Sequence, residues 1–237
     1  MTTTGTSAFN LDLGELIEEA FERAGSEVRS GYDFRTARRS LNLLTIEWAN
    51  RGINLWTIEQ GQIPMVTGQT TYTLPIDTID LLDQVIRTNP GTTYQTDINI
   101  SRISESTYST IPNKLATGRP IQVWINRQSG ATTPTGVASP TINVWPTPND
   151  PGSQYTLVYW RLRRIQDVGD GANTQDIPFR FLPAMVAGLA FYLSVKIPNT
   201  DPQRVMGLKQ DYEEQFRLAS EEDREKASVR FVPRMIR

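Results

Sequence analysis

The sequence predicts an α+β protein in which helices from the two ends of the chain form an antiparallel bundle carrying a central antiparallel β-sheet or sandwich. Apolar residues recur with helical spacing near both ends, whereas β-branched and aromatic runs separated by Gly, Pro and Asn fill the middle. Helices and strands in separate blocks are typical of α+β rather than alternating α/β folds. We therefore expect a helical domain of residues 8–60 and 176–228, a β domain of residues 61–175, and an extended C-terminal segment of residues 229–237.

Two amphipathic helices are expected after a polar start of the chain. In the first, Asp12 and Glu15 have the spacing of a capping box, and Gly25 provides a stop. The second is expected to begin at Asp33 as N-cap and to end at Gly52. The connection between them is short, so we expect an antiparallel hairpin. The buried stripe expected for the second helix is Phe34, Ala37, Leu41, Leu44 and Trp48.

Six segments in the middle of the chain have the composition of strands, and several alternate between apolar and polar residues. They are residues 70–75, 81–89, 96–103, 120–128, 141–148 and 155–165. A short helical or turn connection is expected over 105–115, and a hairpin loop over 129–140.

Helical character returns after the glycine-rich turn 169–172. The run from Phe181 to Val195 carries no charge, so its helix must be buried, yet it is shorter than the roughly 20 apolar residues of a membrane span. Small residues such as Gly188 would let another helix approach closely. A last helix is expected to begin near Asp201, with Pro202 in its first turn.

Composition limits the chemistry of this chain. It has 237 residues, no cysteine and no histidine, which excludes disulfides, cysteine zinc sites and nucleophiles activated by histidine. Its 24 basic and 26 acidic residues give a net charge of -2, without the basic excess of a dedicated nucleic-acid binder. The start of the chain lacks the pattern of a signal peptide, so synthesis in a cytoplasm is expected. We expect no catalytic residue, no cofactor and no metal ion.

Acidic side chains supply the only candidates for catalysis, and each has a plainer interpretation. Glu18, Glu19 and Glu22 lie on the polar side of the first helix, where a solvated face is favoured over an acid and base pair. Glu47 and Glu59, each close to a tryptophan, could serve as a glycosidase acid, although surface glutamates beside core tryptophans are favoured. A peptidoglycan hydrolase therefore remains an alternative function.

Aromatic and basic residues on the expected strands give two further candidates. Trp124, Trp145 and Trp160 could stack on sugar rings of a cell wall, but core filling or a subunit interface is favoured. Three arginines stand in or at the end of the last strand, and the first two share one face. They could contact phosphates or the carboxylates of a neighbouring subunit, and a solvated strand face is an equal alternative. These residues are Arg161, Arg163 and Arg164.

The C-terminal segment 229–237 contains three arginines, no acid, and the large apolar residues Phe231, Val232, Met235 and Ile236. An exposed segment of this kind commonly becomes ordered on a partner. We therefore expect docking on another protein through Arg230, Phe231, Val232, Pro233, Arg234, Met235, Ile236 and Arg237.

Stretches along most of the chain resemble the head-to-tail adaptor family of short-tailed bacteriophages, also called tail tubular protein A-like or packaged-DNA-stabilising proteins. Each stretch alone is weakly specific, but their shared order over about 200 residues is much more specific. They include EAFERAG (19–25), ARRSLNLLTIEWANRGINLWT (37–57), IPNKLATGRP (111–120), INVWPTPND (142–150), YTLVYWRLRRIQD (155–167) and DIPFRFLPAMVAGLAFYLSVKIP (176–198).

The resemblance implies a structural virion protein that forms a ring of twelve copies between the portal of the capsid and the tail nozzle. Such a ring extends the DNA channel without sequence-specific contacts, and no membrane is involved. In relatives the helical part meets the portal, the β part faces the tail, and C-terminal segments reach into the portal. The last feature would assign that role to residues 229–237.

Overall fold

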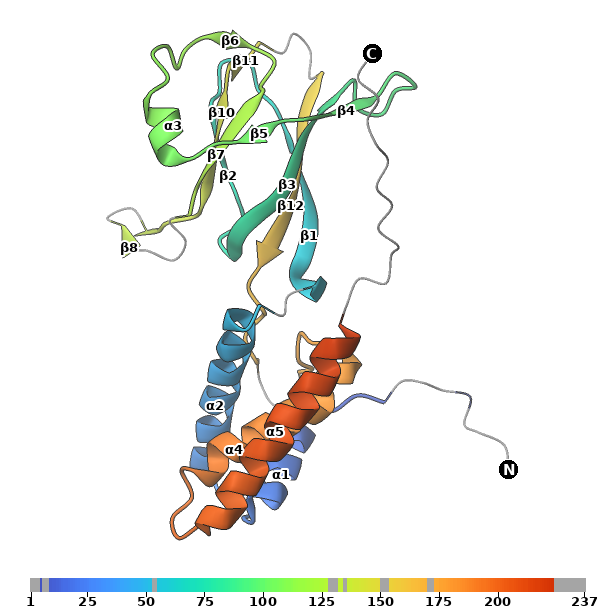
Figure 1. Ribbon diagram of the computed structural model, residues 1–237, viewed down its shortest axis with the longest axis vertical. Helices are drawn as coiled ribbons and strands as arrows, with labels where there is room; N and C mark the ends of the chain where they lie inside the picture. Colours follow the sequence, from blue (N-terminus) through green and yellow to red (C-terminus); the bar gives the residue numbers. More distant parts are fainter. Residues whose placement is uncertain are drawn as a thin grey trace. The chain divides into compact units, whose positions relative to one another are not determined.

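The computed structural model describes residues 5, 9–52, 55–127, 132–133, 136–149, 154–169 and 173–223. The chain is a mixed α+β protein that divides into two compact units (Figure 1). The helical unit comprises Met1–Leu55 and Ile165–Arg237, and the β unit comprises Trp56–Arg164. Both chain ends thus belong to the helical unit, and the β unit interrupts it.

Four α-helices and a short 3₁₀ turn build the described part of the helical unit. They are α1 (Leu13–Ala24), α2 (Gly31–Asn50), η2 (Phe179–Phe181), α4 (Leu182–Ser194) and α5 (Pro202–Glu222). The capping box of α1 is confirmed, since Asp12 and Glu15 exchange both hydrogen bonds and Gly25 follows in the left-handed conformation with φ 86°. The predicted start of the last helix is also confirmed: Asp201 is the N-cap of α5, and Pro202 lies in its first turn.

The predicted start of α2 was wrong. Its N-cap is Ser30, whose extended backbone lets the hydroxyl accept a hydrogen bond from the backbone N–H of Asp33. Asp33 therefore lies inside the first turn, where its negative charge also suits the helix dipole. The sequence offers two residues suited to an N-cap, Ser30 and Asp33, three positions apart, and the prediction took the later one.

Helix α4 is the core of the helical unit, packing against α5, α1 and α2. Ten of its 13 residues are buried, as the absence of charge predicted, whereas Phe191 and Tyr192 are half-buried and Pro183 is exposed. A Cβ built on Gly188 would lie 2.9 Å from both Leu44 Cδ2 and Tyr212 Cε2, so the glycine allows α2 and α5 to approach α4 together. The uncharged run is thus covered by helices of its own unit.

The β unit holds two four-stranded sheets, with strand orders β1-β12-β3-β4 and β2-β10-β7-β5. Further elements are two short strand pairs, the turn η1 (Leu55–Thr57) at the unit boundary, and helix α3 (Glu105–Ser109). The strands are β1 (Ile58–Pro64), β2 (Thr71–Thr73), β3 (Thr78–Thr88), β4 (Thr96–Asn99), β5 (Ser101–Arg102), β6 (Thr117–Gly118), β7 (Gln122–Asn126), β8 (Thr132–Thr133), β9 (Gly136–Val137), β10 (Thr141–Trp145), β11 (Thr147–Pro148) and β12 (Tyr155–Arg163).

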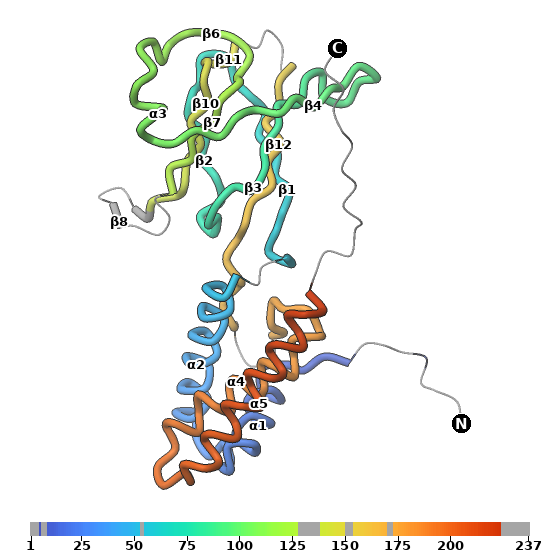
Figure 2. Tube along the Cα trace, in the orientation of Figure 1, coloured from blue at the N-terminus to red at the C-terminus, as the bar shows by residue number. Residues whose placement is uncertain are grey.

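Most of the pairings are antiparallel, as predicted, but β5 with β7 and β6 with β11 are parallel. Strand β1 lay outside the predicted strands because a glycine interrupts it and it ends in proline. It pairs along its whole length with β12, so that Ile58 lies opposite Leu162 (Figure 2). The chain therefore enters and leaves the β unit on neighbouring strands.

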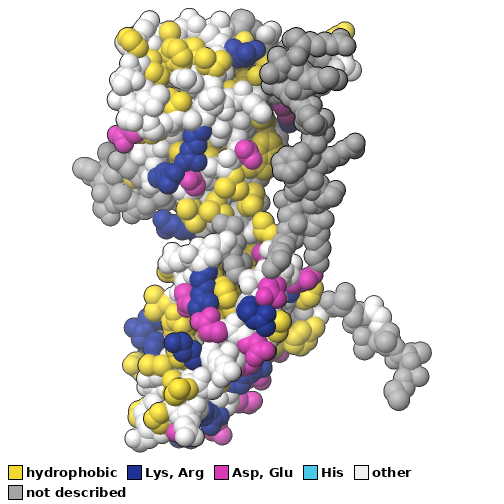
Figure 3. All heavy atoms as spheres, in the orientation of Figure 1, with side chains coloured by type: hydrophobic (Ala, Val, Ile, Leu, Met, Phe, Trp, Pro, Cys, Tyr) yellow, Lys and Arg dark blue, Asp and Glu magenta, His cyan; other side chains and the backbone are white. Residues whose placement is uncertain are grey.

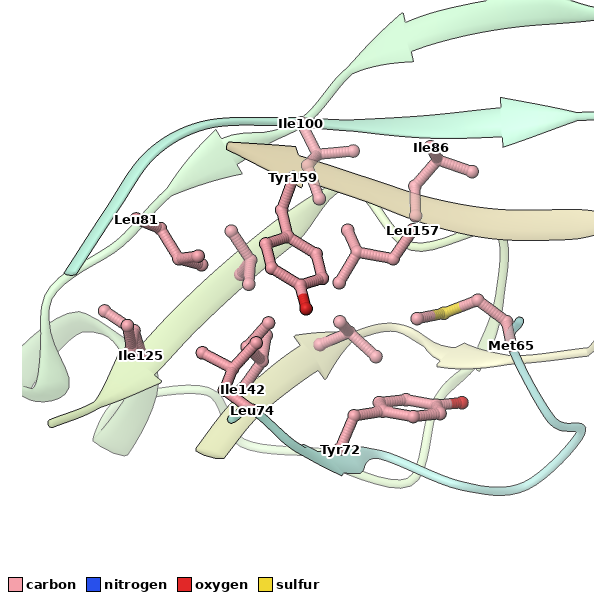
Figure 4. Close-up of a cluster of buried hydrophobic side chains, with 12 residues drawn as sticks. Met65, Tyr72, Leu74, Leu81, Ile86, Ile100, Ile125, Ile142, Leu157 and Tyr159 are labelled. Carbon is pink, nitrogen blue, oxygen red and sulfur yellow. The ribbon is translucent and has the colours of Figure 1, made fainter. Parts of the chain in front are cut away.

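The two sheets enclose the core of the β unit (Figure 4). Leu157, Tyr159 and Ile86 of the first sheet lie in one buried cluster with Ile142 of the second. The ring of Tyr159 covers Gly61, its partner in the register, because a Cβ there would lie 2.3 Å from Cζ of the tyrosine. Gly61, which interrupts the strand pattern of β1 in the sequence, thus leaves the space that the Tyr159 ring occupies.

Candidate functional site

The C-terminal segment singled out from the sequence, Arg230 to Arg237, lies outside the described residues. The structure describes the chain up to residue 223, six positions before residue 229. Helix α5 ends at Glu222, and the side chain of the following Asp223 is only 2 % exposed and forms an ion pair with Arg180 of η2. The C-terminal end of α5 is therefore tied to the segment that leads into α4.

Glu47, a candidate acid, lies at the centre of a polar network between three helices. Its carboxylate accepts hydrogen bonds from the hydroxyls of Tyr192 at 2.8 Å and Tyr212 at 3.2 Å, and from Nη2 of Arg51 at 2.5 Å. Burial and the Glu47 carboxylate raise the pKa of Tyr192 to about 12. Both tyrosines thus remain hydroxyl donors at neutral pH, and Glu47 joins α2 to α4 and α5.

Arg51 extends this network to α5. Its guanidinium donates to both carboxylate oxygens of Glu213 at 2.8 Å and lies over the ring of Phe216, 4.4 Å from its centroid. The hydrogen bond from Arg51 lowers the pKa of Glu213. Trp48 donates from Nε1 to the Tyr212 hydroxyl at 2.9 Å. Sequence reasoning missed Arg51, although its position just after the apolar stripe of α2 suits a residue that caps an interhelical contact.

Glu59, the second candidate acid, belongs to an ion-pair cluster in the β unit. Its two oxygens accept from Nη2 of Arg161 at 2.7 Å and from Nε of Arg163 at 2.6 Å. Arg161 also donates from Nη1 to Asp77 at 2.6 Å. Burial alone would raise the pKa of Asp77, but the hydrogen bond and charge of Arg161 outweigh it and lower that pKa. The carboxylate of Glu59 thus serves to hold two strand arginines.

The three candidate arginines differ in exposure. The side chains of Arg161 and Arg163 are 10 % and 9 % exposed, whereas Arg164 is an exposed residue. Contact of these arginines with a neighbouring subunit or with DNA stays a prediction. Of the three, Arg164 is the one whose side chain could contact a subunit or DNA without disrupting the ion pairs around Glu59.

The candidate tryptophans also have internal partners. Trp124 stacks on Tyr108 of α3 with ring centroids 5.2 Å apart, so one face of its indole is covered. Trp145, on the neighbouring strand of the same sheet, donates from Nε1 to the backbone carbonyl of Asn113 at 3.0 Å. Trp160 lies in the other sheet. The three indoles therefore do not share one sheet face, as a sugar-binding platform would require.

Two open pockets lie on the described surface, and neither is lined by Glu47 or Glu59. One, of about 470 Å³, lies beside Trp124, and the other, of about 770 Å³, lies along α5 around Gly207.

Within the described ranges, no group of three or more acidic side chains is placed to hold a metal ion. No helix in those ranges is long and apolar enough to cross a membrane. Of the turn 169–172, only Gly169 is described.

Sequence reasoning also missed an exposed apolar pair on α2. Leu43 and Ile46 remain 54 % and 58 % exposed, one turn apart on the side of α2 that faces away from α4. The signal was present in the sequence, since both are large aliphatic residues that fall outside the predicted buried stripe. Hydrophobic and basic side chains lie next to one another on the visible surface of the helical unit (Figure 3).

These observations describe a chain in which Glu47 and Glu59 serve as structural ties and whose helical surface carries unpartnered apolar residues, as in proteins that act through contacts with other proteins. Comparison with known families agrees. The model of the SU10 adaptor protein family matches residues 11–234, so the chain belongs to this family of phage adaptor proteins. No curated protein matches the chain. The resemblance to a phage adaptor family is therefore confirmed.

Proposed function

We propose that the chain is a head-to-tail adaptor that forms a ring between the portal and the tail nozzle, completing the head after DNA packaging. The observation that carries this proposal is the family match, which runs from α1 to beyond α5 and so includes both units. By the resemblance described above, the ring contains twelve copies. The protein would be made in the host cytoplasm and reside in the virion at the head–tail interface.

Each part of the chain receives a role in this proposal. The helical unit, taken as an antiparallel bundle, would meet the portal, and the β unit would face the tail. Residues 229–237 would dock on the portal through their arginines and apolar side chains. The ion pair between Arg180 and Asp223 supports this role because it fixes the end of α5 from which the docking segment leaves.

A role as a DNA conduit agrees with the charges of the chain. DNA must slide through a channel, and many phosphate contacts from Lys and Arg would hold it back. The net charge is -2. Arg161 and Arg163, the two buried strand arginines, are neutralised by Glu59 and Asp77 rather than left free for phosphates. The ring would therefore let genomic DNA pass without sequence-specific binding.

Deletion of residues 229–237 tests the docking role. We expect the shortened chain to fold with unchanged thermal stability, because the buried apolar residues of the described part of the chain all precede residue 220, but no longer to join purified portal rings. Light scattering and electron microscopy of portal and adaptor mixtures measure the result, including the number of copies in the ring. A Gly/Ser segment of equal length in place of 229–237 is the control for chain length. Normal ring formation by either variant would refute the docking role.

A further inference from the structure

Helix α2 exposes one continuous stripe along the side that faces away from α4. Its residues follow one another at intervals of three and four, which keeps them on a single helix face. Two large aliphatic side chains lie at the C-terminal end of the stripe, and two arginines lie N-terminal to them. In chain order, the stripe is Tyr32, Arg35, Arg39, Leu43 and Ile46.

Helix α5 exposes a stripe of its own, on the side opposite its buried residues Tyr212 and Phe216. Met206 in this stripe is 73 % exposed. Nothing lies within 4 Å of a Cβ built on the adjacent Gly207. Both residues line an open pocket of about 770 Å³. In chain order, the stripe is Gln203, Met206, Gln210, Glu214 and Arg217.

The two stripes match when their helices run antiparallel. The intervals of the α2 stripe are three, four, four and three residues, and those of the α5 stripe are the same when read from either end. If Leu43 is placed opposite Met206, Arg35 falls opposite Glu214, because each lies eight residues, or about 12 Å, from the apolar pair. Every position of one stripe then meets a position of the other.

Three of the five facing pairs are complementary in this register, while Arg39 meets Gln210 and Ile46 meets Gln203. Leu43 meets Met206 beside the hollow at Gly207, Arg35 meets Glu214, and the ring of Tyr32 meets the guanidinium of Arg217. Arg35 and Glu214 form no hydrogen bond or ion pair with other residues in the described part of the chain, so both charges are available. An apolar contact flanked by an opposite-charge pair is the pattern by which helix seams select partner and orientation.

We propose that the α2 stripe of one copy of the chain docks antiparallel on the α5 stripe of the next copy. This inference rests on the proposed function, since it supplies the lateral contact that the ring needs. The contact joins two different surfaces, so it is heterologous, and repetition of a heterologous contact closes into a ring when the rotation permits. A symmetric dimer would instead bring one stripe against itself, which places Arg39 against Arg39 for the α2 stripe and Met206 against Glu214 for the α5 stripe.

Cross-linking in the virion tests the contact directly. The chain has no cysteine, so a phage encoding Leu43→Cys and Met206→Cys together carries two unique thiols per copy. Treatment of purified particles with a short bismaleimide, followed by denaturing electrophoresis, should give a ladder of covalent oligomers. Each single-cysteine variant should remain monomeric. The matched control, Glu18→Cys with Met206→Cys, replaces the α2 position by an exposed one on α1 and should give no ladder.

The possible results separate this inference from the proposed function. Absence of the chain from purified particles would overturn both. Presence in particles without a ladder, or a dimer from Leu43→Cys alone, would overturn the α2-to-α5 contact and leave the adaptor function standing. A ladder restricted to the double variant supports the contact and its head-to-tail direction.

Charge reversal provides a second, independent readout. Arg35→Glu and Glu214→Arg each place like charges face to face, so each should lower incorporation into particles about tenfold, while the double variant restores the opposite-charge pair and most of the incorporation. Thermal unfolding of the purified single variants should be unchanged, since neither side chain has a partner within the described part of one copy. Equal losses in the single and double variants would contradict the pairing.

Discussion

Gly188 and Gly207 are both glycines within helices, but a methyl group would meet different surroundings at the two positions. At Gly188 an added Cβ would lie 2.9 Å from the side chains of Leu44 and Tyr212, whereas at Gly207 nothing lies within 4 Å. The small residues of α4 thus set how closely its neighbouring helices approach. The close approach of other helices to α4 could be predicted from the sequence. An uncharged helix must be buried, and its glycine and alanine residues leave room for neighbouring helices to pack closely against it.

Alanine at each of these glycines should therefore have opposite effects on stability. Gly207→Ala should raise the free energy of unfolding by about 0.5–1 kcal/mol, the ordinary gain of alanine over glycine in a helix. Gly188→Ala receives the same gain but overpacks the core, so it should be about 1–3 kcal/mol less stable than Gly207→Ala. Urea denaturation of both variants measures the difference, and equal stabilities would show that Leu44 and Tyr212 can move aside.

The candidate acids show the limit of sequence reasoning at this scale. Glu47 and Glu59 were recognised as residues near tryptophans, but their partners Tyr192 and Arg161 lie 145 and 102 positions away in the chain. No local pattern connects such residues. Sequence alone favoured surface glutamates; their side chains are 28 % and 43 % exposed, and what the sequence did not reveal is that each is bonded to side chains of other elements of its own unit.

Among elements, those with strong local signals were predicted best. The capping box of α1, the proline start of α5 and the uncharged run of α4 are each encoded within a few neighbouring residues. Strand β1 was missed because Gly61 interrupts its pattern, and what defines it is the pairing with distant β12. The parallel pairing of β5 with β7 likewise depends on tertiary contacts that no alternation of residues reveals.

The ion pairs that join elements should make the fold sensitive to acid. Arg51 on the C-terminal side of α2 lowers the pKa of Glu213 on α5, and in the β unit the effect of Arg161 outweighs that of burial to lower the pKa of Asp77. A carboxyl group with a lower pKa in the folded state stabilises fully above its unfolded pKa, near 4, and this stabilisation is lost as pH falls through the folded pKa.

We therefore expect the free energy of unfolding to stay level from pH 7 to about pH 5 and to fall below about pH 4. Urea denaturation at a series of pH values measures this dependence. Glu213→Gln removes one of the two groups, so this variant should be less stable at pH 7 and should lose less on acidification. An acid slope identical to that of the wild type would show that Glu213 does not contribute.

At the scale of the whole molecule, the pairing of Ile58 with Leu162 makes the β unit an insertion whose two ends lie on adjacent strands. The blockwise order of helices and strands in the sequence already predicted an insertion of this kind. The positions of the boundaries were harder to predict, because the turn η1 and strand β1 carry few of the residues that favour strands.

Replacement of residues 56–164 by a short glycine-rich linker should leave a folded helical unit. Paired strands lie only about 5 Å apart, so a few residues can join the two ends, and α4 keeps its partners α1, α2 and α5. Circular dichroism and thermal unfolding should show a cooperative helical transition. A variant that lacks α4 instead is the control that should not fold. Non-cooperative melting of the linker variant would show that the helical unit depends on the β unit.

The ion pair between Arg180 and Asp223 has a consequence for the proposed docking segment that follows from chain length alone. Six peptide steps separate residue 223 from residue 229, so residue 229 can reach at most about 21 Å from this anchor. A binding segment on so short a tether has an effective concentration in the millimolar range near any surface that α5 approaches. Each copy therefore needs only a weak intrinsic affinity for its partner, because the anchor confines the search to a small volume.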